Sequence, residues 1–209
     1  MQKIISAVSF GLAAADFLGS RQLSENLCPP SDFSTVTDFS LDSFIAAPWY
    51  IQQQQEVAYL PLSQNYCVKA EYSKRDWNIF GYDLSVQNTA QNAEGEVQSS
   101  DALCAKIVDS ARGKLKVAPC FLPPPLAGPY WVVAYKEVPG YALISGGPPT
   151  IASNGACRTG SGVNDAGLWI FTRQQTRNET LVDEVRAIAS SKGFDLTVLN
   201  DVDQANCQN

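Results

Sequence analysis

The chain has 209 residues, of which 45% are hydrophobic, and this suits a domain with a sizeable core. Its formal net charge of −6 argues against nucleic acid or an anionic membrane surface as the main partner. Because it contains no histidine, the commonest general base and the commonest metal ligand are both missing, and we predict neither a metal site nor a cofactor.

The N-terminal segment is typical of a secretory signal peptide. One positive charge precedes a short apolar run over 4–15, which ends in small residues before Asp16. The run is too short for a transmembrane helix, and no other segment is apolar enough to span a bilayer. We therefore predict a signal peptide over 1–15 and secretion. A plastid presequence of signal type and a buried N-terminal helix are the alternatives.

Strand-like segments follow an irregular stretch over 16–43. They are short, rich in β-branched and aromatic residues, and several alternate polar with apolar side chains. They cover 49–57, 66–73, 77–86, a bent or interrupted pair at 94–100 and 104–109, then 114–121, 130–135, 141–145 and 168–173. Turn residues separate them at 74–76, 110–113 and 138–140, and a long Gly/Ser/Asn-rich loop covers 146–167.

One helix is predicted near the C-terminus. Thr176 or Asn178 can cap it, and Lys192-Gly193 ends it. A short strand-like segment follows at 194–199. About eight antiparallel strands followed by one helix predict an all-β fold, an eight-stranded antiparallel up-and-down barrel with the helix packed outside. The predicted organisation is a signal peptide at 1–15, an irregular segment at 16–43, and the barrel with its helix and tail at 44–209.

Several of these segments, over 44–207, resemble lipocalins of the apolipoprotein D-like group. Residues 44–50, ending in Trp49-Tyr50, are similar to the first family motif, with Ala47 in place of its glycine. Residues 130–134 and 141–145 are similar to the paired sixth and seventh strands, but the usual Thr-Asp-Tyr between them is missing. Residues 169–173 resemble the eighth strand with its closing Arg173, and 203–207 resemble the family's C-terminal end.

The resemblance implies a protein that binds and carries a small lipophilic ligand of lipid, sterol, retinoid or carotenoid type. It also implies that Arg173 covers Trp49 and closes one end of the barrel through a cation–π contact. Trp131 matches a pocket position, and the alternation of its strand groups Val133 and Tyr135 with it. The expected ligand-binding residues are Trp131, Val133, Tyr135, Tyr72, Ala70, Phe80 and Tyr82.

Six cysteines in an oxidising compartment predict three disulfides. The resemblance implies Cys67–Cys207, which directs Cys67 outward and so Ala70 and Tyr72 inward, and Cys28–Cys157. Hairpin geometry supplies Cys104–Cys120, because the two stand at equal distances from Arg112 in the 110–113 turn and should face each other to within one residue.

Asn178 begins an N-glycosylation sequon, Asn-Glu-Thr, where a glycan would compete with its capping role. An alternative function is a lipocalin-fold enzyme acting on a lipid or carotenoid, of de-epoxidase or isomerase type. We predict no enzyme, because the sequence shows no inward carboxylate pair and its cysteines are expected to be paired. A protein-protein or inhibitor role is the third alternative, and the sequence indicates no oligomeric state.

Overall fold

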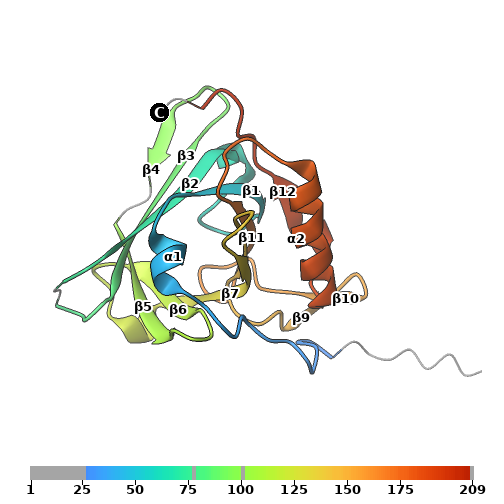
Figure 1. Ribbon diagram of the computed structural model, residues 1–209, viewed down its shortest axis with the longest axis horizontal. Helices are drawn as coiled ribbons and strands as arrows, with labels where there is room; N and C mark the ends of the chain where they lie inside the picture. The colour runs from blue at the N-terminus through green and yellow to red at the C-terminus, as the bar shows by residue number, and fades with distance from the viewer. Residues whose placement is uncertain (1–26, 77–78, 100–101, 208–209) are drawn as a thin grey trace, which may run out of the picture.

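The computed structural model describes residues 27–76, 79–99 and 102–207, so the predicted signal peptide lies outside the described residues. Antiparallel strands form a closed barrel of eight strands, in which β4 and β5 are two parts of one interrupted strand (Figure 1). Its strands are β1 (Trp49–Gln55), β2 (Tyr66–Lys74), β3 (Leu84–Gln91), β4 (Val97–Ser99), β5 (Leu103–Asp109), β6 (Lys114–Pro119), β7 (Gly128–Lys136), β8 (Tyr141–Ser145) and β11 (Leu168–Thr172). Because β11 pairs with β1, the sheet has no open edge, and the predicted fold class is confirmed.

Apolar side chains pack on both faces of the barrel wall. Two clusters lie inside: one gathers around Trp49, Val68, Ile144 and Phe171, and the other around Leu84, Val86, Ala105 and Leu115. We call these the first and second interior clusters. A third cluster lies on the outer face of β8 and β11, beneath the C-terminal helix.

The helix α2 (Glu179–Ser191) lies outside the barrel (Figure 1). It begins at Asn178, whose side chain accepts a hydrogen bond from the Leu181 amide, and it ends before Gly193, which has a φ of +82°. Val185 and Ala189 are fully buried against the wall strands. The predicted helix is therefore confirmed.

The strand predicted over 77–86 begins later than expected. β3 starts at Leu84 and runs on to Gln91, and residues 77–78 lie outside the described part of the chain. Gly81 has a φ of +66°, and the Asp83 carboxylate accepts a hydrogen bond from the Ile107 amide at 2.7 Å. These two features accompany a turn at 79–80 and irregular backbone at 81–83, which the period-two pattern conceals.

Three other segments differ from the expected outline. The 16–43 segment, taken as irregular, contains most of the short helix α1 (Leu41–Ile45). The long loop contains a small hairpin, β9 (Ile151–Ser153) with β10 (Ala156–Arg158). The expected strand at 194–199 is instead a 3₁₀ turn, Leu196–Val198, followed by β12 (Leu199–Asp201), because the Asp195 carboxylate accepts hydrogen bonds from the amide and the hydroxyl of Thr197.

Cysteines pair as predicted, in the disulfides Cys28–Cys157, Cys67–Cys207 and Cys104–Cys120. The predicted hairpin register is wrong, however, because the offset between the two cysteines is one residue larger than the prediction allowed. Cys104 stands opposite Ala118, so Cys120 lies two positions beyond the residue facing it. The turn has the predicted place, and a bulge at Val108 adds the remaining offset, so this disulfide runs diagonally between the strands.

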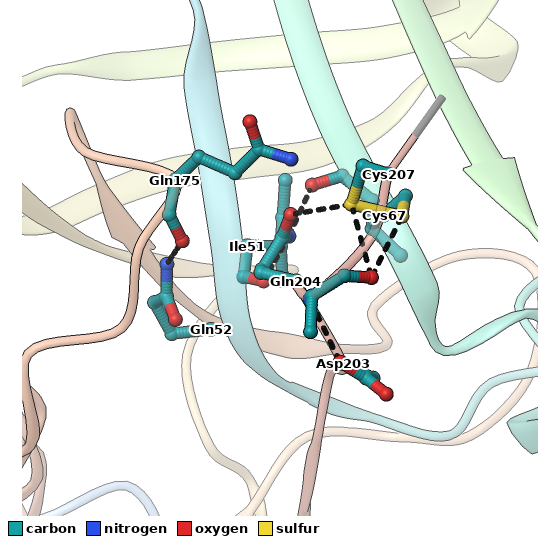
Figure 2. Close-up of a disulfide and its surroundings, with 9 residues drawn as sticks. Ile51, Gln52, Cys67, Gln175, Asp203, Gln204 and Cys207 are labelled. Carbon is teal, nitrogen blue, oxygen red and sulfur yellow. Dashed lines mark hydrogen bonds between the residues drawn. A yellow bond between two sulfur atoms is a disulfide. The ribbon is translucent and has the colours of Figure 1, made fainter. Parts of the chain in front are cut away.

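The C-terminal tail fills a gap in the barrel wall. β1 and β2 pair only at Trp49–Ala70 and Tyr50–Lys69, and beyond that point β12 pairs with β1. The Gln204 side chain then donates to the carbonyl oxygens of Ile51 and Val68, both at 2.8 Å. Figure 2 shows Gln204 between Ile51 and the Cys67–Cys207 disulfide. The tail is thus part of the wall.

The disulfides should differ in how much they stabilise the fold. Cys67–Cys207 closes a loop with a sequence separation of 140, and Cys104–Cys120 one of 16. In the chain-entropy model, replacing the first pair by serine lowers the free energy of unfolding by about 4–5 kcal/mol and replacing the second by about 3 kcal/mol. Urea unfolding of the two double variants measures both values. A smaller loss for the long-loop variant would contradict the role assigned to the tail.

Candidate functional site: the barrel interior

One end of the barrel is closed by aromatic side chains. The helix α1 places Phe44, which is 1% exposed, against Trp49, with ring centroids 5.3 Å apart. Phe39 and Tyr135 complete the group, with centroids 5.2 and 5.9 Å from that of Phe44. The Trp49 indole N–H donates to the Phe44 carbonyl oxygen at 2.8 Å, so the burial of this indole leaves no polar group unpaired.

Arg173 lies over this closed end. Its guanidinium carbon is 3.6 Å from the centroid of the Trp49 ring, which is the cation–π contact expected from the sequence. The same group donates to the carbonyl oxygens of Ser43 and Phe44, at 2.7 and 2.9 Å, and also to those of Ala47 and Pro48. One side chain of the last barrel strand therefore holds the segment that enters the first strand.

The predicted orientation of the β7 side chains is partly wrong. Val132 pairs with Ile144 and Ala134 with Leu143, so Val133 is an extra residue in a β-bulge. As a result Val133 packs in the outer cluster beneath α2. Tyr130, Val132 and Tyr135 face inward instead.

Trp131 also lies outside the barrel. Its ring stacks near Phe33, with centroids 6.5 Å apart, and the Lys114 ammonium lies 4.4 Å from its centroid. The expectation that Trp131 lines the interior is therefore wrong. The chain contained a usable signal, since Lys114 and Lys116 alternate on the neighbouring strand and β6 pairs Lys114 with Trp131.

The remaining expected residues fall into two groups. Ala70 and Tyr72 face inward as predicted, and Tyr135 faces inward at the closed end. Phe80 and Tyr82 precede β3 and belong to neither interior cluster. The Tyr82 hydroxyl donates instead to the Leu122 carbonyl oxygen at 2.8 Å.

Two aromatic residues that the sequence reasoning did not assign to the site lie inside the barrel. The rings of Tyr130 and Trp169 are nearly parallel, with centroids 6.5 Å apart. The Tyr130 hydroxyl lies 2.6 Å from that of Tyr72, on the opposite wall. The interior is thus aromatic and apolar, with a few hydroxyl groups.

Four consecutive glutamines on β1, Gln52 to Gln55, are all buried. A bulge between Ile51 and Gln53 breaks their alternation. Gln52 donates to Thr172 at 2.9 Å, and Gln53 donates to the Asp201 carboxylate at 2.7 Å. This hydrogen bond lowers the pKa of Asp201. The glutamines thus join β1 to β11 and to the tail.

We searched the described residues for candidate sites other than the barrel interior. They contain no group of three or more side chains placed to hold a metal ion. A groove outside the barrel, between the tail and the start of α2, is lined mainly by polar groups such as Asn65, Arg177 and Asn200. No described helix is long and apolar enough to cross a membrane.

Replacing Arg173 should open the closed end. Arg173→Met removes the carbonyl hydrogen bonds and the cation–π contact, and we expect the free energy of unfolding to fall by about 2–4 kcal/mol. Arg173→Lys keeps the charge but not the planar fork, so it should lose less. Urea unfolding followed by tryptophan fluorescence measures the difference. Equal stability of Arg173→Met and the parent protein would contradict this role.

Comparisons with known proteins agree with this architecture. The chain is 26% identical to apolipoprotein D of Mus musculus over 164 residues, covering 76% of each chain. No family model matches it.

Solved structures share the fold at low identity. Insecticyanin from the tobacco hornworm Manduca sexta matches with a TM-score of 0.58 at 18% identity, covering 87% of this chain and 89% of that one. Lipocalin 12 from rat epididymis gives 0.56 at 14%, covering 86% and 93%, and lobster apocrustacyanin A1 gives 0.54 at 17%, covering 84% and 93%. The chain therefore shares its fold with these solved structures, and its sequence is similar to that of apolipoprotein D.

Proposed function

We propose that this protein binds and carries one small lipophilic molecule in the barrel interior. The observation that carries the proposal is that several inward-facing side chains keep part of their surface accessible while packing against the interior clusters. They are Tyr72, Tyr130, Leu103 and Val117. An apolar concave site with a few polar groups suits a ligand of lipid, sterol, retinoid or carotenoid type. The likeness to apolipoprotein D supports the proposal.

A carrier is favoured over an enzyme by the chemistry of the interior. All six cysteines are in disulfides, so none of them offers a thiolate nucleophile. The acidic side chains of the wall point outward: Glu71 pairs with Lys69, and Asp83 pairs with Lys106. The remaining proton donors are tyrosine hydroxyls, those of Tyr72 and Tyr130 and that of Tyr135 at the closed end, and burial raises the pKa of each. Tyrosine hydroxyls that stay protonated at neutral pH suit binding better than proton transfer.

Secretion is part of the proposal. Three disulfides are consistent with folding in an oxidising compartment and with an extracellular location. The signal peptide expected over 1–15 would direct the chain there, with the plastid as the alternative destination.

Glycosylation of Asn178 is compatible with its role as a helix cap. Its Oδ1 accepts the hydrogen bond from the Leu181 amide at 3.2 Å, whereas a glycan is attached to Nδ2. The residue is exposed, so a glycan there would extend into solvent. This geometry supports a glycan at Asn178 alongside the cap.

Ligand binding should be reported by interior tryptophans. Titration with an uncharged fluorescent lipid should saturate at one equivalent and quench tryptophan emission, because Trp169 faces the interior. Trp169→Phe should remove a large part of the quenching, and Trp131→Phe is the matched control because that ring lies outside. Larger loss of quenching in Trp131→Phe, or no saturable binding, would contradict the proposed site.

Glycosylation of Asn178 and its role as helix cap can be tested separately. In protein secreted from eukaryotic cells, digestion with an N-glycosidase should lower the mass by one glycan, and Asn178→Asp should abolish that shift while keeping a capping oxygen. Asn178→Asp should unfold within about 0.5 kcal/mol of the parent protein made in a host that attaches no N-glycan, where residue 178 is still asparagine. A mass that the enzyme leaves unchanged would contradict the proposed modification.

A further inference from the structure

Two tyrosine hydroxyls meet across the barrel interior. Tyr72 lies on β2 and Tyr130 on β7, with β3, β5 and β6 between these strands in the sheet. Their oxygens are 2.6 Å apart. Both rings pack against the first and the second interior cluster, so the pair stands where the two apolar regions meet. We call this pair the tyrosine crossbar.

A count of protons leaves the crossbar with one free donor. Each hydroxyl carries one hydrogen, and a hydrogen bond between the two uses only one of them. Within the described residues, neither hydroxyl makes another hydrogen bond. The rings around them are apolar: Phe44 is 5.3 Å from Tyr72 and Trp169 is 6.5 Å from Tyr130, between centroids. A donor in such surroundings gains most from an acceptor brought by a ligand.

The crossbar remains uncharged at neutral pH. Burial raises the pKa of Tyr72, and it raises that of Tyr130 well above the ordinary value, with the neighbouring Tyr72 adding to the effect. Both groups therefore stay protonated, and the free hydrogen is available for donation.

No positive charge in the described part of the interior is free to pair with an anionic ligand. Lys69 and Lys106 are bound to carboxylates on the outer face, and Lys114 lies over Trp131 outside the barrel. Arg173, at the closed end, keeps its charge, which opposes the rise in the pKa of Tyr72, but its N–H groups already donate to carbonyl oxygens and its plane lies over Trp49. An ionised carboxylate carried inside would thus lose its hydration without gaining a direct ion pair.

We propose that the tyrosine crossbar binds an uncharged oxygen acceptor of the ligand, such as a ketone or hydroxyl, and this inference rests on the proposed function. We also propose that the interior selects against carboxylates. The crossbar donates one hydrogen bond, and the two interior clusters hold the hydrocarbon parts on either side of it. The expected ligand is therefore a lipophilic molecule that carries an uncharged oxygen group between two hydrocarbon parts.

The test compares three competitors of equal chain length: a long-chain methyl ketone, the alkane and the fatty acid. Each displaces an uncharged fluorescent lipid from the parent protein and from variants at pH 7.5. The parent should bind the ketone about tenfold more tightly than the alkane, because a hydrogen bond to a free buried donor is worth about that much. It should bind the fatty acid at least tenfold more weakly than the ketone.

The double variant Tyr72→Phe/Tyr130→Phe should bring ketone affinity to within about twofold of alkane affinity. Each single variant retains one hydroxyl and should lose less. Tyr141→Phe is the matched control, because that ring packs in the outer cluster, and it should leave all three affinities unchanged.

Two results would overturn the crossbar inference while leaving the proposed function intact. One is an unchanged ketone-to-alkane ratio in the double variant, and the other is fatty acid binding as tight as ketone binding in the parent. Failure of the fluorescent lipid itself to bind the folded parent would overturn the proposed function, and the crossbar's role with it.

Discussion

The contact between Arg173 and Trp49 is the interaction on which the barrel's shape depends. It joins the end of β11 to the start of β1, the two strands that must meet for the sheet to close. The arginine also binds carbonyl oxygens of the segment carrying Phe44, so the aromatic plug and the wall are held by one group. Gly140 makes room for it, since a Cβ there would lie 2.6 Å from the Arg173 Cγ. One end is therefore sealed, and a ligand must enter elsewhere.

The C-terminal tail supplies backbone hydrogen bonds that β1 would otherwise lack. β1 leaves β2 after two paired residues, and without the tail its amides and carbonyls would lack partners there. β12 and Gln204 supply those partners, and Val202 adds an apolar side chain to the first interior cluster. The Cys67–Cys207 disulfide then keeps the end of the chain in place.

The sequence predicted which segments form strands and helices better than it predicted which side chains of a strand point into the barrel. Alternation and turn residues were sufficient for the barrel, and capping residues for the helix. The inward position of Tyr72 needed in addition the Cys67–Cys207 disulfide that the family resemblance implied. The disulfide pairs were also accessible, two through family resemblance and one through hairpin geometry. Strand alternation fails at a bulge, because one extra residue turns every later side chain over. For this reason Val133 was assigned to the wrong face.

Trp131 was misplaced for a different reason. Its assignment rested on a family position, and nothing in its own strand distinguishes an indole facing a ligand from one stacked near Phe33 under a lysine. The crossbar could not be predicted from periodicity either, because it depends on two strands that are distant in the sheet and face each other only once the barrel has closed.

The interior that results is sealed at one end, aromatic along its wall and free of an available positive charge in its described part. These properties favour a carrier of a neutral lipophilic molecule. The most direct measurement is native mass spectrometry of the purified native protein, with mass analysis of its organic extract. The account predicts one uncharged lipophilic molecule per chain, carrying at least one ketone, aldehyde or hydroxyl oxygen. A protein that yields no ligand and binds none offered to it would contradict the account.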